Sequence, residues 1–212
     1  MDILSEIAAE LERGEDEKVR SLTESALAQS VEAPAILNEG LIAGMEGVGR
    51  RFGAHEIFLP DVLLAARAMN AGLALLEPHL GEGQVASRGK VVIGTVQGDL
   101  HDIGKNLVGI MLAGAGFEVI DLGKDVSPQK FVETARESQA DVIGMSALLT
   151  TTMPVMRQVV SLLKEEGLDG SVRTVVGGAP VTEEFAREIG ADAYGFDAAN
   201  AVVVVKRLAG VI

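Results

Sequence analysis

The sequence contains no cysteine, which excludes disulfides, thiolate metal sites and cysteine nucleophiles together. Basic residues are also scarce: 18 lysines and arginines stand against 31 acidic residues, so the net charge is −13 and the pI is about 4.6. Binding to phosphate groups needs clustered Lys and Arg that release counterions. The charge balance therefore argues against a nucleic acid or an anionic membrane as partner.

Recognisable targeting and membrane signals are missing as well. Residues 1–18 are amphipathic and acidic, without the basic and apolar regions of a secretion signal. No apolar run approaches the roughly 20 residues needed to cross a bilayer. The chain also shows no internal repeat and no low-complexity tract. We expect a soluble, cytoplasmic protein that has no membrane partner.

Hydrophobic residues make up 48% of the 212-residue chain, enough to bury the core of one large domain or two small ones. Up to about residue 80 the apolar residues recur at helical spacing, with breaks at Gly14, Pro34 and residues 53–60. This pattern predicts four helices. We predict a helical domain over residues 1–82, a glycine-containing linker over 83–89 and a second domain over 90–212.

In the second domain, short β-branched runs alternate with helical segments, a pattern typical of a parallel sheet with crossover helices. Ser127 with Pro128, and Thr182 with two glutamates after it, are expected to begin two of the helices. The fold class is therefore α/β: an N-terminal four-helix bundle followed by a flavodoxin-like, Rossmann-like five-stranded parallel sheet. Strands are predicted at residues 91–96, 117–122, 142–146, 174–176 and 193–195.

The loop after the first predicted strand carries the most distinctive chemistry. His101 is one of three histidines, and it follows a carboxylate, Asp99, that can accept its second ring hydrogen. That arrangement fixes an imidazole tautomer and strengthens the ring as a metal donor. Gly98 and Gly104 would let the backbone turn sharply and a bulky flat ligand approach. An ordinary turn and helix cap with an exposed histidine is the alternative. The candidate residues of this loop are Gly98, Asp99, Leu100, His101, Asp102, Ile103 and Gly104.

Three further loops should meet this one, because the carboxyl ends of parallel strands lie at one edge of a sheet. Hydroxyl groups follow the third strand, and glycines follow the fourth. Each segment alone is ordinary, since hydroxyls cap helices and glycines close strands. Together they line one edge. The candidates there are Ser146, Leu148, Thr150 and Thr152 after the third strand, Gly177, Gly178 and Ala179 after the fourth, and Tyr194 and Asp197 around the fifth.

These residues carry a family resemblance. The pattern Asp99-x-His101-x-x-Gly104, then Ser146-x-Leu148 and Gly177-Gly178, resembles the cobalamin-binding domain of methionine synthase and of the corrinoid proteins of methylotrophic and acetogenic methyltransferase systems. Residues 45–49, 58–60 and 65–72 make the helical domain similar to the four-helix cap that precedes that domain. The resemblance covers essentially the whole chain.

The resemblance implies a role for each loop. His101 would replace the cofactor's nucleotide base as the lower ligand of cobalt, with Asp99 bonded to the ring. Thr152 would complete the relay, as a threonine where the family also uses serine. The displaced nucleotide tail would enter a slot, with glycines where a side chain would fill it. This slot would be lined by Ser146, Leu148, Thr150, Gly177, Gly178 and Ala179.

The helical domain would act as a cap over the methyl-cobalt face, and it would have to move to admit each partner. Phe58 and Leu59, beside a loop and just before Pro60, are the best candidates for covering that face. Most of the other apolar residues, such as Met45, Val48 and Met69, are expected to fill the helical core instead.

The function implied is that of a methyl carrier. It would accept a methyl group on cobalt(I) from a substrate-specific methyltransferase and pass it to a second methyltransferase, with a reductive activase as a further partner. The chain has no region left for a methyl donor or acceptor site and no Cys/His cluster for zinc. We therefore expect a cofactor-carrying subunit that is not catalytic alone.

Alternative functions are the small subunit of an adenosylcobalamin-dependent mutase and a corrinoid-sensing regulatory module. Such mutase subunits lack the helical cap, and a regulator would attach a DNA-binding segment, of which the sequence shows no sign. A receiver domain would need clustered acids after the first strand and a lysine after the fifth, which are not evident. A flavin site would leave His101 unexplained.

Overall fold

The computed structural model describes residues 2–80 and 87–211. The chain divides into two compact units, a helical unit up to residue 80 and an α/β unit from Ser87 onward. Most of the linker predicted over residues 83–89 falls on positions outside the described ranges. The exact limits of the two domains therefore stay a prediction.

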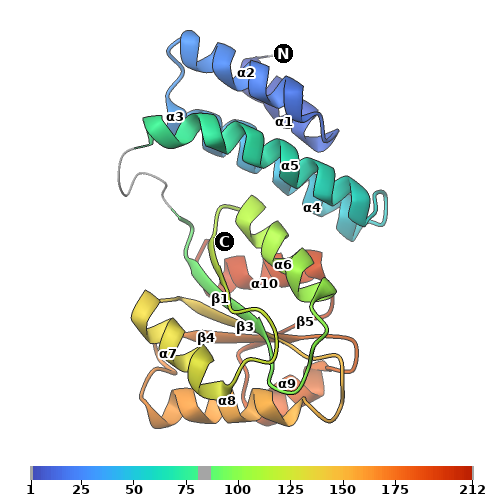
Figure 1. Cartoon of the computed structure of the whole chain (residues 1–212), viewed down its shortest axis with the longest axis vertical. Coiled ribbons are helices and arrows are strands. Elements are labelled where there is room, and N and C mark those ends of the chain that lie inside the picture. Colours follow the sequence, from blue (N-terminus) through green and yellow to red (C-terminus); the bar gives the residue numbers. More distant parts are fainter. Residues whose placement is uncertain (1, 81–86, 212) are drawn as a thin grey trace. The chain divides into compact units, whose positions relative to one another are not determined.

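The helical unit contains four helical segments, as the apolar spacing predicts. The first two are α1 (Ile3–Glu12) and α2 (Asp16–Ala28). The third is continuous and comprises α3 (Ala33–Ala35), η1 (Ile36–Ile42) and α4 (Ala43–Gly53), and the fourth is α5 (Leu59–Leu76) with η2 (Glu77–His79). Figure 1 shows α4 and α5 side by side. The difference from expectation is η1, a π-helical stretch inside the third segment, which the apolar spacing did not indicate.

The core of the helical unit is built from the residues that recur at helical spacing. Small residues let helices approach closely here: a Cβ added to Gly44 of α4 would lie 2.9 Å from the backbone oxygen of Ala8 in α1. Side chains from every segment are fully buried, which is how an amphipathic helix gains most of its stability. They include Ile7, Leu11, Val19, Ile36, Leu41, Val48, Val62, Ala65 and Leu76.

One helix of this unit passes a simple length and hydropathy test for a membrane span. Leu59–His79 has 21 residues with a mean hydropathy of 1.4, which is long and apolar enough to span a membrane by length and composition alone. Its leucines and alanines raise the mean, although Asp61, Arg67 and Asn70 interrupt the apolar run. A buried stripe along α5 that includes Val62, Met69 and Leu76 is what a helix packed in a protein core shows, and core helices pass the same test.

The α/β unit contains a five-stranded sheet in which all neighbouring strands are parallel, so the predicted fold class is confirmed. The strands are β1 (Lys90–Thr95), β2 (Glu118–Asp121), β3 (Val142–Ser146), β4 (Arg173–Gly177) and β5 (Ala193–Gly195), in the order β2-β1-β3-β4-β5. The register pairs Thr95 with Ser146 and Ser146 with Gly177, so the carboxyl ends of the three central strands lie level.

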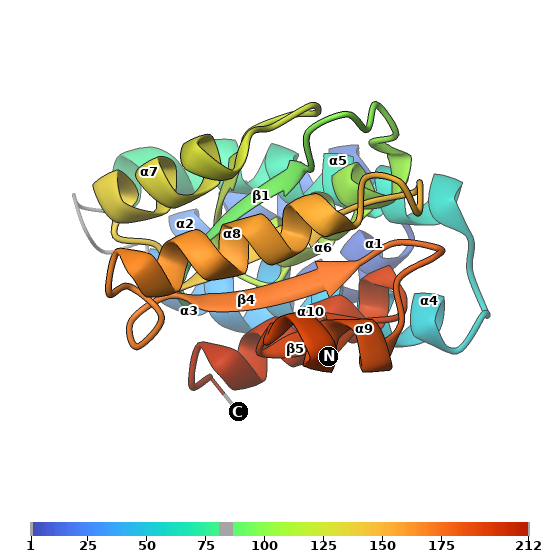
Figure 2. The same cartoon turned by 90° about the horizontal axis from the view of Figure 1, so that it is seen from below.

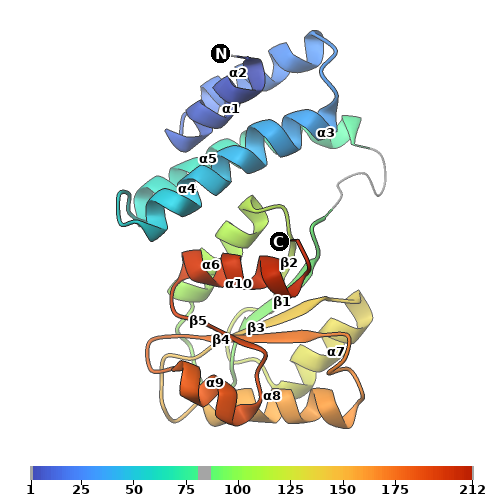
Figure 3. The same cartoon turned by 180° about the vertical axis from the view of Figure 1, so that it is seen from behind.

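Five helices cover the two faces of the sheet. They are α6 (Ile103–Gly114), α7 (Pro128–Ser138), α8 (Pro154–Glu165), α9 (Glu183–Ile189) and α10 (Ala198–Leu208). Figures 1 and 3 show α6 and α10 on one face and α7, α8 and α9 on the other; the latter three lie across the near face in Figure 2. The predicted caps are confirmed, because Ser127 accepts from the Lys130 N–H and Thr182 from the Phe185 N–H.

This topology fixes where a ligand can bind. The helices that follow the neighbouring strands β1 and β3 lie on opposite faces of the sheet. Ligands of open α/β sheets bind at such a switch point, outside the carboxyl ends of the strands. The two loops that leave this point are residues 96–102 and 147–153.

Candidate functional site

The carboxylate of Asp99 is the centre of the switch point. It is fully buried in the loop between β1 and α6. Its Oδ1 accepts from the backbone N–H of His101 at 3.0 Å and faces the ring Nδ1 of the same residue at 2.7 Å. Its Oδ2 accepts from the backbone N–H of Leu148 at 2.7 Å and of Leu149 at 3.1 Å, and from the Thr152 hydroxyl at 3.0 Å. The structure thus brings together the three residues predicted as a relay.

This environment keeps Asp99 ionised. Burial by itself raises the pKa of the carboxyl, but the hydrogen bonds outweigh it and hold the pKa well below its ordinary value of 3.8. The donors responsible are the His101 and Leu148 N–H groups, the His101 ring and the Thr152 hydroxyl. An ionised carboxylate can only accept, so Nδ1 of His101 must carry the hydrogen of this bond. In the neutral ring, Nε2 then presents a lone pair.

Two further residues hold the His101 loop, and sequence reasoning missed both. The Thr95 hydroxyl donates to the carbonyl of His101 at 3.0 Å. Asp125, in the loop between β2 and α7, accepts from the Gly98 N–H at 2.7 Å, and its own N–H donates to the carbonyl of Asp99 at 3.1 Å. Thr95 lies in the first predicted strand, one residue before its end, which was a usable signal. Asp125 shows no such signal, because its contacts with the loop depend on the backbone of the segment between β2 and α7, which includes a left-handed residue at Asp125 itself (φ 57°).

The His101 ring and several large apolar side chains are exposed at the same edge of the sheet. The side chain of His101 is 53% exposed, although the Asp99 beneath it is buried. Large hydrophobic residues that follow β1, β3 and β5 are exposed at the same sheet edge, which is unusual enough to indicate a binding surface. The exposed fractions are 62% for Leu100, 75% for Ile103, 44% for Leu148, 40% for Leu149 and 65% for Phe196. Of these, Leu149 and Phe196 were not predicted.

Comparison with known proteins decides the family. A family model described as a B12 binding domain matches residues 89–204, and a second model with the same description matches residues 3–77. The chain belongs to the B12-binding corrinoid protein family. The resemblance inferred from the sequence is therefore confirmed over both units.

Curated corrinoid proteins are similar over nearly their full length. A dimethylamine corrinoid protein of Methanosarcina acetivorans is 48% identical, over 97% of this chain and 96% of its own. A trimethylamine corrinoid protein of Methanosarcina barkeri is 46% identical, over 91% of this chain and 89% of its own. Among solved structures, the methanol:cobalamin methyltransferase complex from Methanosarcina barkeri matches with a TM-score of 0.89. That match has 29% identity and covers 98% of this chain and 80% of the other.

The residues present fit a corrinoid. Among the described residues there is no group of three or more His, Asp or Glu side chains that could hold a metal ion. The exposed His101 ring, held by the buried Asp99, offers a single nitrogen ligand, which is what a metal already held in a macrocycle needs from the protein. Gly104 supports the same conclusion, because a Cβ there would meet no atom within 4 Å and the fold itself does not need a glycine.

The glycines that follow β4 are needed for close packing of the backbone. A Cβ on Gly178 would lie 1.9 Å from the backbone oxygen of Ala147, and φ there is +125°. On Gly177 it would lie 2.9 Å from the oxygen of Gly195. Close backbone packing is by itself enough to require glycine at both positions. A role for them beside the nucleotide tail stays a prediction.

The remaining predicted residues are spread along the same edge, with local roles of their own. Asp197 caps α10 by accepting from the Asn200 N–H at 2.7 Å, and the Asp102 carbonyl accepts from Asn106 in the first turn of α6. Tyr194 packs against the core of the α/β unit rather than projecting from the edge. Ser146 ends β3, while Thr150 and Ala179 are exposed in the following loops. Contact of any of them with the cofactor stays a prediction.

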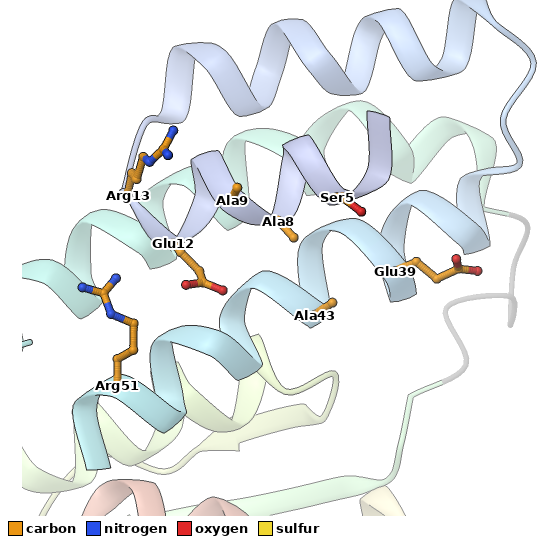
Figure 4. Close-up of a pocket in the computed structure, with 8 residues that line it drawn as sticks. All are labelled: Ser5, Ala8, Ala9, Glu12, Arg13, Glu39, Ala43 and Arg51. Atoms are coloured by element: carbon orange, nitrogen blue, oxygen red, sulfur yellow. The ribbon is translucent and has the colours of Figure 1, made fainter. Parts of the chain in front are cut away.

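The two cap candidates lie in the helical unit. Phe58 precedes α5 and is 68% exposed, and its N–H donates to Asp61 at 2.8 Å. Leu59 is the first residue of α5. Met45, Val48 and Met69 are buried, as expected of core residues. A groove of about 420 Å³ lies on this unit between α1 and the continuous segment of η1 and α4. Figure 4 shows the residues that line it, and neither Phe58 nor Leu59 is among them.

Proposed function

We propose that this chain is a methyl carrier that binds a cobalt corrinoid through His101. The observation that carries the proposal is the buried, ionised Asp99, which fixes the His101 ring with its Nε2 lone pair free. When bound, the corrinoid supplies a cobalt centre nucleophilic enough to take up a methyl group and to release it again.

The protein's own residues orient and tune that centre. Asp99 holds the imidazole tautomer, and its negative charge strengthens the ring as a donor. Thr152 donates to Asp99 or to the Leu149 carbonyl at 2.8 Å, so its single hydroxyl hydrogen has two acceptors within reach. The exposed apolar rim would exclude water from the face of the macrocycle. Phe58 and Leu59 would contribute to covering the opposite face.

Separate methyltransferases are proposed as partners. Relatives with 46–48% identity carry names of dimethylamine and trimethylamine corrinoid proteins, and the related methanol structure is a complex with a methyltransferase. A methylated amine is therefore the first donor to test. One methyltransferase would load the carrier and a second would unload it, with a reductive activase restoring cobalt(I). The proposed location is the cytoplasm.

The test is a methyl-transfer assay with the protein reconstituted with hydroxocobalamin and reduced. A methylamine:corrinoid methyltransferase from one of the Methanosarcina relatives, together with its amine, should convert the reduced cofactor to its methylated absorption spectrum. The conversion should require both the enzyme and His101. If a panel of methylamine and methanol methyltransferases all leave the cofactor unmethylated, the carrier function is contradicted.

A further inference from the structure

We propose that Asp125 is a positioning residue for His101, which it holds by bracing the loop between β1 and α6. The inference rests on the proposed function, because positioning is defined relative to the metal that His101 would bind. It concerns a residue outside the Asp99, His101 and Thr152 relay and in a different loop, between β2 and α7.

The first support is geometric. Asp125 engages the His101 loop twice: its Oδ1 accepts from the Gly98 N–H at 2.7 Å, and its N–H donates to the Asp99 carbonyl at 3.1 Å. A single residue therefore binds the backbone N–H of Gly98, the residue before Asp99, and the backbone carbonyl of Asp99 itself. Its left-handed backbone, φ 57°, is a conformation that Asp and Asn adopt more readily than other side-chain-bearing residues.

A second support is that the bracing loop is itself anchored. Lys105 in α6 is buried, and its Nζ donates to both carboxylate oxygens of Asp121, at 2.7 and 2.6 Å. Asp121 ends β2 and also accepts from the Gly123 N–H at 2.8 Å. The loop that carries Asp125 is thus fastened at its start to the same helix that follows the His101 loop. Because this loop is itself held in place, the hydrogen bonds from Asp125 can restrain the backbone of the His101 loop.

The reason a brace is needed lies in the His101 contacts themselves. Both bonds from His101 go to one oxygen of Asp99, only two residues away, so they fix the ring to its own loop. The direction of the ring then depends on what holds that loop to the sheet. Leu148, Leu149 and Thr152 hold the Asp99 side chain from the β3 side, and Asp125 holds its backbone from the β2 side.

Three variants isolate this contribution. Asp125→Gly removes the acceptor without strain, because glycine adopts positive φ freely. Asp125→Asn keeps both an acceptor oxygen and the tolerance for this backbone. Asp141→Gly is the matched control, since Asp141 also accepts one backbone bond at 2.7 Å, from the Lys90 N–H, at the opposite end of the sheet.

Two measurements follow. In the apoprotein, exchange of the Gly98 amide with solvent should accelerate by about tenfold or more in Asp125→Gly, the factor that corresponds to losing one charge-assisted hydrogen bond. In protein loaded with cobalt(II) cobalamin and labelled with ¹⁵N-histidine, the electron paramagnetic resonance spectrum should show less histidine-coordinated cobalt. Asp125→Asn should restore most of both signals, and Asp141→Gly should change neither.

Several results would overturn the proposal. They are an unchanged Gly98 exchange rate, an unchanged fraction of histidine-coordinated cobalt in Asp125→Gly, and an equal loss in Asp141→Gly. Faster exchange without loss of coordination would make Asp125 a purely structural residue and would also overturn it. Wild-type protein that binds no corrinoid would instead contradict the proposed function, and the apoprotein exchange would still decide whether Asp125 braces the loop.

Discussion

Replacing Asp99 by asparagine should reverse the tautomer of His101. The substitution keeps the shape of the side chain but turns one acceptor oxygen into an NH₂ donor. The groups around the carboxylate are three backbone N–H donors, the His101 ring and the Thr152 hydroxyl. Whichever oxygen the NH₂ group replaces, it therefore faces at least one N–H donor, with which it cannot form a hydrogen bond. The oxygen that the NH₂ group replaces decides which nitrogen of the His101 ring carries the hydrogen.

The two amide orientations can be compared from the contacts. If the NH₂ replaces Oδ2, it opposes the N–H groups of both Leu148 and Leu149. If it replaces Oδ1, it opposes the backbone N–H of His101 alone, provided the ring turns its Nδ1 into an acceptor. Each unsatisfied buried donor costs about 1–3 kcal/mol. The second orientation leaves one buried donor unsatisfied instead of two, so it is the more stable. In that orientation the ring hydrogen moves to Nε2, where it blocks metal coordination.

The assay is ¹⁵N nuclear magnetic resonance of histidine-labelled apoprotein, in which the nitrogen shifts report the tautomer. With only three histidines in the chain, the His101 signals can be assigned by their loss in His101→Ala. We expect hydrogen on Nδ1 in the wild type and on Nε2 in Asp99→Asn, with the free energy of unfolding lowered by about 1–3 kcal/mol. An unchanged tautomer together with unchanged stability would refute the reasoning.

Further predictions concern neighbouring residues and pH. Thr152→Val should lower the free energy of unfolding by about 1 kcal/mol in urea titrations, because one of several donors to Asp99 is lost, and Thr152→Ser should restore it. Gly178→Ala should lower the free energy of unfolding by about 2 kcal/mol or more, since the added Cβ would overlap the Ala147 oxygen. Gly104→Ala should raise the free energy of unfolding of the apoprotein by up to about 1 kcal/mol, because a Cβ there meets no atom, and it should weaken corrinoid binding in a dialysis assay. Because the folded-state pKa of Asp99 is depressed, its contribution to stability is present above its ordinary pKa of 3.8 and lost as the pH falls toward the lower value. The difference in stability between wild type and Asp99→Asn should therefore be constant near neutral pH and shrink below about pH 4.

The sequence was sufficient for the parts of the fold and site that depend on local pattern. β-branched runs place the strands within about one residue, and the parallel topology then implies that the loops after β1 and β3 meet at one edge. The choice of Thr152 as partner of Asp99 came from the family resemblance, and the structure shows the contact. The helix caps at Ser127 and Thr182 follow from side-chain chemistry in the same way.

Other parts depend on contacts that no local pattern encodes. Asp125 reaches the site from the loop between β2 and α7, where its own backbone is left-handed, and Leu149 contributes its backbone N–H, which any residue except proline could supply. The need for Gly178 arises from the backbone of the neighbouring β3 loop. Such requirements are set by the distance between segments far apart in the chain, so only coordinates reveal them.

The most direct test of the central claim is reconstitution of the apoprotein with hydroxocobalamin, followed by dialysis and absorption spectroscopy of wild type and His101→Ala. The account predicts that the wild type retains corrinoid and that the two proteins differ in spectrum or in retention, because the variant lacks the nitrogen ligand to cobalt. A wild-type protein that retains no corrinoid, or one indistinguishable from His101→Ala in both readouts, would contradict it.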